Sequence, residues 1–424
     1  MAKRLVVCCD GTWNFADQPS RTNVAKVALS VRPGFAAGKE QRVYYHSGVG
    51  TRRRDRLRGG AFGAGLSQNV VDAYRFLVET YEPDDELFLF GFSRGAFTAR
   101  SLAGLLRNSG ILRRDHADRI PEAWALYRDR VERPNGAAAT LFRRSYARET
   151  EIRFIGVWDT VGALGIPVPD APSLRPAVNR FNRRWAFHNT ELSSWVRAAF
   201  HALAVDEQRS AFRPALWHRQ PGAVGEGQEL QQVWFAGVHC DVGGSYRQTG
   251  LSDIALLWMV DQARRHGLEF EAEVLGEVGP EVMRPEESTD FRVRPDALGE
   301  LHTSRNGWYR LAKPLHRPIG EAANAGGEPD GNEFLAVPAK ERRDRDPRYR
   351  PPALERYLAV QERIRLEPVL LPDLAAGLPP LPPAPPADRP PSPADRADAS
   401  DAAGASRPSG ASPSRGPRRD GPHG

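Results

Sequence analysis

The chain has 424 residues, of which 40% are hydrophobic, including nine tryptophans and eighteen phenylalanines. This content is ample for a large core, and the length suits one α/β domain with insertions. The formal net charge of +6 suits an anionic partner such as a membrane surface or a nucleic acid, although a solvated basic surface is the simpler explanation. Cys8 and Cys9 are adjacent and point to opposite faces of a strand, so the cysteines do not form a disulfide framework. We therefore expect folding in a reducing compartment.

The sequence predicts neither a signal peptide nor a membrane-spanning helix. The N-terminal stretch MAKRLVVCCDGTWN lacks the apolar length of a signal peptide, and no apolar run in the sequence approaches the length of a membrane span. We therefore expect a cytoplasmic protein, or one that is exported by a route that needs no cleavable signal.

The first predicted strand covers 5–9 and ends in the loop DGTWN at 10–14. A polar, glycine-containing loop at the carboxyl end of a parallel strand is where open α/β sheets place ligand sites. The N–H of Gly11 or Thr12 is a candidate oxyanion donor; the alternative is a tight turn capped by its own aspartate side chain. The DGT sequence also occurs in haloacid-dehalogenase phosphatases, but these need a second aspartate where this chain has Cys8.

Three further elements are predicted before the most informative segment: a helix over 23–31, a strand over 41–46 and an amphipathic helix over 66–81. Between the last two, TRRRDRLRGGAFGAG at 51–65 places five arginines before a glycine-rich run. It lacks the G-K-[ST] ending of a phosphate loop. We interpret it as a solvated basic loop, or as one that steers an anionic headgroup toward a nearby site.

The most informative segment is 85–107, DELFLFGFSRGAFTARSLAGLLR. The continuous apolar run at 87–90 predicts a strand buried on both faces, and the residues after 91–95 have helical spacing. Strand, G-x-S-x-G and helix in direct succession are typical of the nucleophile elbow of an α/β-hydrolase. In this interpretation Ser93 is the nucleophile and the N–H of Arg94 is an oxyanion donor. A G-x-S-x-G that occurs by chance would leave Ser93 as an ordinary turn residue.

Two later strands end in candidate partners for the serine. The strand at 151–157 is followed by Asp159, at the position where this fold keeps the acid that orients its histidine, although a turn cap would be an unremarkable role. The strand at 231–238 ends in His239, which we assign as the general base because the chain order is then serine, acid, histidine. Together with Asp241 it also forms an H-x-D pair, but two ligands are weak support for a metal site.

The segment 190–212, TELSSWVRAAFHALAVDEQRSAF, predicts a helix. It carries His201, which is an alternative general base, although a histidine in an apolar helical face is more often packed in the core. A further helix is predicted over 251–266, after which 267–350 is polar and turn-rich and 351–366 is a candidate last helix.

We expect one α/β-hydrolase-like domain at 1–366, with a mostly parallel sheet, helices on both faces, and helical or irregular cap insertions at about 110–150 and 165–230. The remainder, 367–424, is rich in proline, alanine, arginine and serine. That composition cannot bury a core, so a disordered tail is predicted.

Six segments in this order resemble the DUF2235 family: CCDGTWN, YYHSGVGT, LFGFSRGAFTARSLAGLL, FIGVWDTVGALGIP, HALAVDEQRSAF and VWFAGVHCDVGGSY. Members of that family include the catalytic domain of Tle1-like phospholipase effectors of the bacterial type VI secretion system. The resemblance covers about 3–259 and implies an α/β-hydrolase fold, Ser93 as the nucleophile and phospholipid esters as substrates. It leaves the choice between His239 and His201 as the base open, because His201 lies in a family motif of its own. A stand-alone esterase also fits, since the sequence shows no large membrane-anchoring module.

These observations predict a serine hydrolase that cleaves carboxylic esters, with phospholipids as the leading substrates and no need for a metal or an organic cofactor. One alternative is an esterase or amidase that acts on a soluble metabolite. Another is a non-catalytic protein that binds anionic membranes through 52–58. The expected partners are a lipid or another ester substrate and the surface of an anionic membrane, with no nucleic acid; the sequence does not predict an oligomeric state.

Overall fold

The structure is a computed structural model. It describes residues 2–11, 14, 20–36, 39–48, 61–129, 131, 133–161, 191–220, 227–271, 275, 293–305, 313–321, 331–360 and 364–371. All of these residues lie in one compact unit of the chain, 1–382. Large parts of three predicted features fall outside the described residues: 51–60 of the basic loop at 51–65, 165–190 of the second insertion, and 372–424 of the tail predicted from 367, whose first residue lies in a strand.

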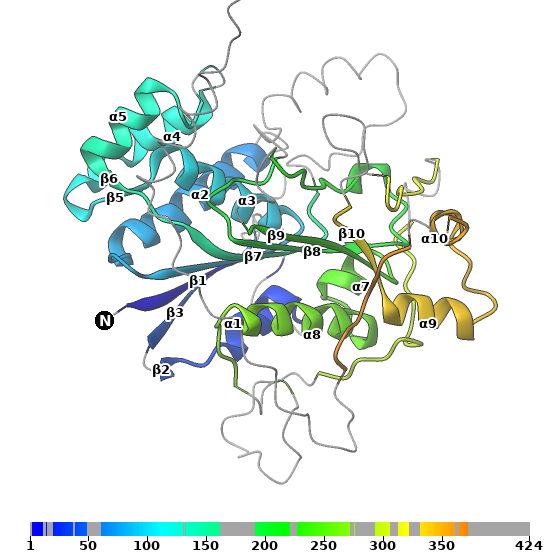
Figure 1. Ribbon diagram of the computed structural model, residues 1–424. Coiled ribbons are helices and arrows are strands. Elements are labelled where there is room, and N and C mark those ends of the chain that lie inside the picture. Colours follow the sequence, from blue (N-terminus) through cyan, green and yellow to red (C-terminus); the bar gives the residue numbers. More distant parts are fainter. Residues whose placement is uncertain are drawn as a thin grey trace, which may run out of the picture. The chain divides into compact units, whose positions relative to one another are not determined.

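The described strands form a nine-stranded sheet and a separate two-stranded ribbon (Figure 1). The sheet order is β11-β10-β9-β8-β7-β4-β1-β3-β2. Neighbours from β11 to β3 are parallel, and the edge strand β2 is antiparallel to β3. The predicted α/β fold with a mostly parallel sheet is therefore confirmed. The sheet strands are β1 (Lys3–Cys9), β2 (Gly34–Ala36), β3 (Lys39–His46), β4 (Glu86–Phe92), β7 (Ile152–Trp158), β8 (Ala198–Ala204), β9 (Glu229–Phe235), β10 (Glu333–Ala336) and β11 (Leu366–Glu367), and the ribbon strands are β5 (Ile111–Leu112) and β6 (Ala147–Arg148).

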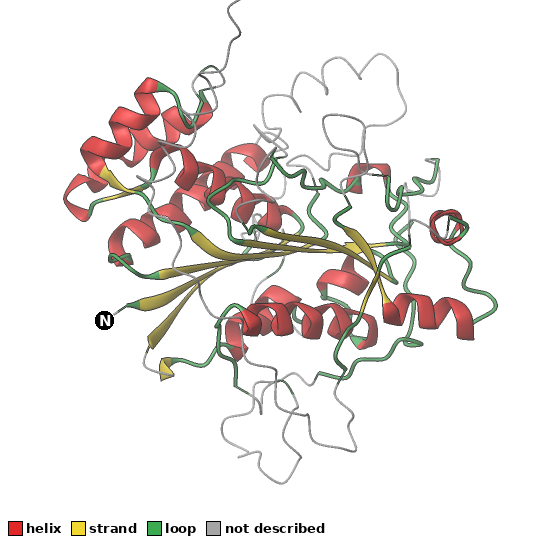
Figure 2. Cartoon of the chain, viewed as in Figure 1, coloured by secondary structure: helices red, strands yellow, loops and turns green. Residues whose placement is uncertain are grey.

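Helices cover both faces of the sheet (Figure 2). One face carries α2 (Ala61–Thr80), α3 (Arg94–Ser109), α4 (Ile120–Arg128) and α5 (Ala137–Tyr146). The other carries α1 (Asn23–Ser30), α7 (His239–Gly243), α8 (Gly250–Arg265) and α9 (Val337–Arg345). The remaining described helical elements are α10 (Pro352–Leu358) and two 3-10 turns, Arg114–Arg119 and Ser210–Phe212.

The two helical layers enclose two cores, which explains the apolar run of β4. Leu87 and Leu89 pack on the α2 and α3 side, whereas Phe88 and Phe90 pack on the α1 and α8 side. Successive side chains of a strand point to opposite faces, so a strand between two helical layers needs an apolar residue at every position.

The predicted helix at 190–212 is wrong. Ala198–Ala204 is β8, a central strand of the sheet, and all seven of its residues are buried. A strand buried on both faces shows no polar alternation, so AAFHALA satisfies the pattern of a buried helix and of a buried strand equally. The prediction assigned this segment to an insertion, whereas part of it belongs to the core.

The sequence analysis also missed the strands β10 and β11, which extend the sheet beyond β9. They have four and two residues, too short for a periodic pattern to be detected. The predicted last helix is α10, which ends at Leu358, and residues 61–65, predicted as a loop, are the first part of α2. Within the described residues, no helix has both the length and the apolar character that crossing a membrane requires.

One buried ion pair joins the helices of the α1 and α8 layer and generates a stability prediction. Lys26 Nζ lies 2.5 Å from Asp253 Oδ1, and the side chains are 1% and 0% exposed. Lys26→Met should lower the free energy of unfolding by about 3–5 kcal/mol, because it leaves a buried carboxylate without its counter-charge. Urea unfolding followed by circular dichroism measures this. The exposed pair of Lys340 and Asp344 is the control, and Lys340→Met should cost less than about 0.5 kcal/mol. Equal losses for the two variants would contradict the prediction.

Candidate active site

Ser93 occupies a sharp turn between β4 and α3. The strand ends at Phe92 and the helix begins at Arg94, so Ser93 is the single residue between them. Its backbone has φ 58° and ψ −116°, a region that residues other than glycine rarely adopt. Strained backbone of this kind is concentrated at functional sites, and it matches the strand-to-helix turn of a nucleophile elbow.

Two glycines allow this turn because no side chain fits at either position. A Cβ at Gly91 would lie 2.6 Å from the backbone of Gly95 and Ala96. A Cβ at Gly95 would lie 2.1 Å from the carbonyl oxygen of Cys9, at the end of β1. The close approach is to backbone atoms in both cases, so neither substitution can be absorbed by a side-chain rotation. The first glycine of G-x-S-x-G is thus required by the packing within the elbow, and the second by the packing of the elbow against β1.

His239 connects Ser93 to Asp159. Its Nε2 lies 2.8 Å from Ser93 Oγ, and its Nδ1 lies 2.5 Å from Asp159 Oδ2. Ser93 follows β4, Asp159 follows β7, and His239 begins α7 shortly after β9. Because the carboxyl ends of parallel strands meet at one edge of a sheet, the topology brings together residues that are far apart in sequence. The contacts are those of a Ser-His-Asp triad, and the residues follow one another in the predicted order of serine, acid and histidine.

Asp159 is held by the strand next to its own. Its N–H donates to the carbonyl of Ala202 at 2.7 Å, and its Oδ1 accepts the N–H of Ala204 at 3.1 Å. Both partners lie in β8, so the strand that the sequence analysis misassigned positions the candidate triad acid. The φ of 40° at Asp159 is again one that residues with side chains rarely adopt.

Burial and neighbouring charges act differently on the pKa values of His239 and Asp159. Burial lowers the pKa of His239 below its ordinary value, although the hydrogen bond and the charge of Asp159 oppose that shift. Burial alone would raise the pKa of Asp159, but the guanidinium of Arg317 and the contact with His239 hold it well below its usual range. At neutral pH the arrangement therefore favours a neutral imidazole beside an ionised carboxylate, which is the starting state for general-base chemistry.

Two aromatic rings and one carboxylate surround His239. The ring centroid of Phe92 lies 4.7 Å from that of His239, and the ring of Phe212 meets it edge-on at 4.9 Å. Glu207 Oε2 accepts the backbone N–H of His239 at 3.4 Å, and the Glu207 carboxylate forms an ion pair with Arg209. The imidazole is thus packed between aromatic rings and its side chain is 5% exposed, which limits its access to water.

The loop after β1 holds a buried carboxylate. Asp10 Oδ1 accepts the N–H of Gly11 at 2.6 Å, and Oδ2 accepts the hydroxyls of Thr22 and Tyr45 at 2.7 and 2.6 Å. Burial raises the pKa of Asp10 to about 6. The Gly11 N–H is therefore engaged as the capped-turn interpretation expects, and Thr12, the other candidate oxyanion donor, lies outside the described residues. Arg94, the third candidate, heads α3, where the N–H groups point out of the helix end.

His201, the alternative base, is fully buried within β8 rather than on a helix. Its Nε2 accepts the N–H of Thr160 at 3.0 Å, and its Nδ1 lies 3.4 Å from Gln232 Oε1. Burial lowers the pKa of His201 to about 3, so it is a neutral core histidine at any working pH. The structure brings His239, and not His201, to Ser93.

The second member of the H-x-D pair has a structural partner. Asp241 Oδ1 lies 2.6 Å from His302 Nδ1, and its Oδ2 accepts the N–H of Val238 at 3.0 Å. Within the part of the chain that the structure describes, no group of three or more His, Cys, Asp and Glu side chains could hold a metal ion. Asp241 thus stabilises the backbone beside His239.

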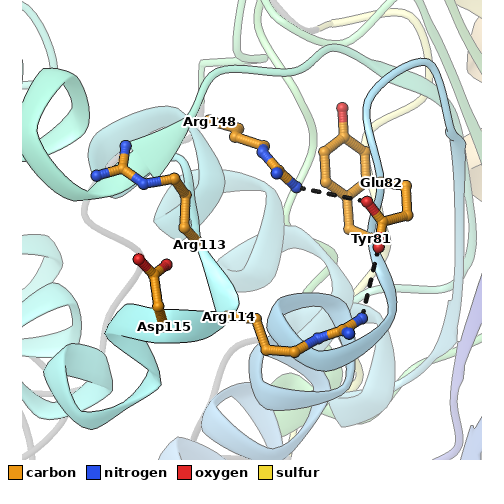
Figure 3. Close-up of a pocket in the computed structure, with 6 residues that line it drawn as sticks. All are labelled: Tyr81, Glu82, Arg113, Arg114, Asp115 and Arg148. Atoms are coloured by element: carbon orange, nitrogen blue, oxygen red, sulfur yellow. Dashed lines mark ion pairs between the residues drawn. The ribbon is translucent and has the colours of Figure 1, made fainter.

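A cavity of about 640 Å³ lies away from these residues (Figure 3). It is lined by Tyr81, Glu82, Arg113, Arg114, Asp115 and Arg148. Glu82 precedes β4 and pairs with Arg114 and Arg148 at 3.6 and 3.9 Å. Ser93 is at the other end of β4, about 20 Å away at the usual rise per residue of a strand. This cavity therefore does not belong to the candidate active site.

Sequence reasoning missed Arg317, which contacts both oxygens of Asp159. It lies in a polar, turn-rich stretch without a motif, 158 residues after the aspartate. No local signal could have placed it, because its role depends on a long-range contact. An arginine that is 0% exposed is visible only in the structure.

Comparison with known proteins gives a family match over more than half of the chain and a curated relative. Residues 3–262 match the family described as "T6SS, Phospholipase effector Tle1-like, catalytic domain". An uncharacterized protein of Saccharomyces cerevisiae, YEL023C, is 30% identical over 244 residues, which make up 52% of this chain and 33% of that protein.

Two solved structures are similar to this chain at lower identity. An uncharacterized protein from Pseudomonas aeruginosa is 19% identical with a TM-score of 0.40, over 69% of this chain and 49% of that one. The Tle1 effector bound to the VgrG spike of the type VI secretion system is 19% identical with a TM-score of 0.32, over 59% of this chain and 52% of the effector. The chain thus spans about a third of the length of the yeast protein and about half of each of the two solved chains.

The packing of the elbow predicts the effect of a single methyl group. Gly95→Ala should lower the free energy of unfolding by about 3 kcal/mol or prevent folding, because the new Cβ meets backbone of β1. Gly104→Ala in the same helix is the control, since its nearest contact is the ring edge of Tyr127 at 3.0 Å. That variant should stay within about 1 kcal/mol of the wild type. A folded, equally stable Gly95→Ala protein in thermal and urea unfolding would show that the elbow has room that the structure denies it.

Proposed function

The chain belongs to the family of the catalytic domain of Tle1-like phospholipase effectors of the type VI secretion system, and on that premise we propose that it is a serine hydrolase of phospholipid carboxylic esters. The observation that carries this proposal is the bridge that His239 forms between Ser93 Oγ and Asp159 Oδ2, at 2.8 and 2.5 Å. Family membership supports the lipid as substrate, and the bridge supports the reaction.

In the proposed mechanism, Ser93 Oγ attacks the ester carbonyl while His239 Nε2 takes its proton. Asp159 holds Nδ1–H of the imidazole, which fixes the tautomer and stabilises the imidazolium. The N–H of Arg94, at the start of α3, and one N–H of the loop after β1 stabilise the oxyanion. His239 then protonates the leaving alkoxide, and a water deprotonated by the same imidazole hydrolyses the acyl-serine.

The substrate class is tested with two sets of esters. Activity on soluble p-nitrophenyl esters should rise with acyl length, because a site for lipids gains from each additional buried methylene, by up to about 0.8 kcal/mol. Vesicles of mixed phosphatidylglycerol and phosphatidylethanolamine should release fatty acid when the enzyme is added. A maximum at the shortest acyl chain with no release from vesicles would favour a soluble ester as the substrate.

Single substitutions test the assigned roles. Ser93→Ala and His239→Ala should each lower kcat by about 10⁴-fold or more, because the two groups act as a unit in proton transfer and attack. His201→Gln keeps a hydrogen-bonding side chain in β8 and should change kcat less than about fivefold. Loss of activity in His201→Gln with activity retained in His239→Ala would reverse the assignment of the base. Vesicle binding that is salt-sensitive and unchanged by Ser93→Ala, without hydrolysis by the wild type, would favour the membrane-binding alternative.

The pH dependence follows from the state of His239. The imidazole must be neutral to accept the proton of Ser93, so kcat/KM falls as the pH drops through its pKa. Burial lowers that pKa, so the midpoint of the acid limb should lie below the ordinary histidine value of about 6.5. Measurements of kcat/KM on a soluble ester give the midpoint directly. A midpoint above 7 would mean that the imidazole is not desolvated as the structure indicates, and Asp10→Asn would separate any titration of the neighbouring loop.

A further inference from the structure

The described segment 313–321 reaches the triad acid, although it lies outside the 3–262 that match the family. Its Leu315 N–H donates to the carbonyl of Gln208 at 2.8 Å, and its Gly320 N–H donates to Glu333 Oε2 at 3.0 Å. The segment is therefore tied at one end to the loop after β8 and at the other to the first residue of β10. Between these two points, Arg317 enters the protein interior and is 0% exposed.

Arg317 binds Asp159 with both ends of its guanidinium. Nη1 lies 2.6 Å from Asp159 Oδ1, and Nη2 lies 3.0 Å from Oδ2. A two-point fork of this kind fixes the orientation of a carboxylate as well as its position. Oδ2 is the same oxygen that faces His239 Nδ1, so the fork sets the direction from which the imidazole is held.

The same guanidinium also fixes the surroundings of the triad. Nη1 donates to the carbonyl of Ala204 at 2.8 Å, and Nη2 donates to the carbonyl of Phe212 at 2.5 Å. Ala204 is the residue whose N–H donates to Asp159, and the Phe212 ring packs edge-on against the imidazole. One side chain thus joins the end of β8, the acid after β7 and the aromatic ring beside His239.

A buried guanidinium is an expensive way to join these elements. Within the described structure, the Nε of Arg317 is buried and has no hydrogen-bond partner. Backbone groups or neutral side chains could join the same elements without the desolvation of a charge. The feature that a neutral brace would not supply is a positive charge in contact with Asp159.

We propose that Arg317 is a positioning residue of the triad, which keeps Asp159 ionised and aimed at His239 and thereby sets the protonation of the imidazole. This inference rests on the proposed serine-hydrolase function. The charges of Asp159 and Arg317 nearly cancel at the position of His239. The carboxylate therefore gives the protonated, charged form of the imidazole little net stabilisation. Among the described residues, the other charged or titratable groups around the pair are Glu207 with its partner Arg209, the thiol of Cys240 in α7, and the neutral His201 in β8.

Two substitutions separate the charge of Arg317 from its shape. Arg317→Met removes the charge, so the Asp159 and His239 pair should take up a proton at higher pH, whichever of the two carries it. We expect the midpoint of the acid limb of kcat/KM to rise by about one pH unit or more. We also expect kcat to fall about 10²-fold with KM within about threefold, because the aim of the triad and not the binding of substrate is lost. Arg317→Lys keeps the charge without the fork, so it should restore the acid limb while kcat stays reduced.

Arg143 in α5 provides a matched control. It is also a buried arginine, with an ion pair to Glu149 at 2.7 Å and hydrogen bonds to the carbonyls of Asn108 and Pro134. Arg143→Met should lower stability, measured by urea unfolding, and leave the pH profile of the active protein unchanged. If Arg317→Met proves unfolded, Arg317→Lys decides: a wild-type acid limb with a reduced kcat supports the proposal, and a wild-type kcat contradicts it.

Nuclear magnetic resonance of the imidazole carbons gives a readout that does not need a substrate. The titration midpoint of His239, identified by its loss in His239→Gln, should rise in Arg317→Met and stay near the wild-type value in Arg143→Met and Arg317→Lys. A midpoint that is equal in all four proteins would overturn the role of Arg317, even if the wild type is an active esterase. If the midpoint shifts in Arg317→Met but the wild type hydrolyses no ester, the result counts against the proposed function and leaves the role of Arg317 in place.

Discussion

The buried carboxylate of Asp159 is the point on which the site depends. It directly follows β7 and is 0% exposed, and a carboxylate that is buried in this way is stable as an anion only if its oxygens are paired. Four groups supply that pairing: the imidazole of His239, the N–H of Ala204, and the two ends of the Arg317 guanidinium. The imidazole comes from α7, the N–H from β8 and the guanidinium from the segment 313–321, so three parts of the chain that are distant in sequence meet at this one charge.

The elbow imposes the second constraint, which is steric. Ser93 reaches His239 because the backbone turns within a single residue between β4 and α3. That turn requires backbone to approach backbone at Gly91 and Gly95, and the second of these contacts β1. The elbow and the end of β1 are therefore one packed unit, in which Gly95 lies against the carbonyl oxygens of Cys9 and Asp10. Stability and chemistry share the same residues at this edge of the sheet.

The sequence predicted those candidate site residues that come shortly after a strand. Ser93, Asp159 and His239 follow short apolar runs, and a parallel sheet makes such positions neighbours whatever their separation along the chain. It misled at β8, because a strand buried on both faces has no alternation to distinguish it from a helix. Arg317 could not be found at all, since its partner is 158 residues away and its own surroundings are polar and turn-rich. Long-range pairing of charges is a property of the folded state only.

The central claim is that Ser93 is a nucleophile activated by His239. Its most direct test is peptide mapping by mass spectrometry after reaction of the folded wild type with a fluorophosphonate. The account predicts a single phosphonyl adduct on the peptide that contains Ser93, and an adduct rate that collapses in His239→Ala but not in His201→Gln. An adduct on another residue, or a folded wild type that gives no adduct, would contradict the account, because the geometry at 2.8 Å would then be that of a structural hydrogen bond.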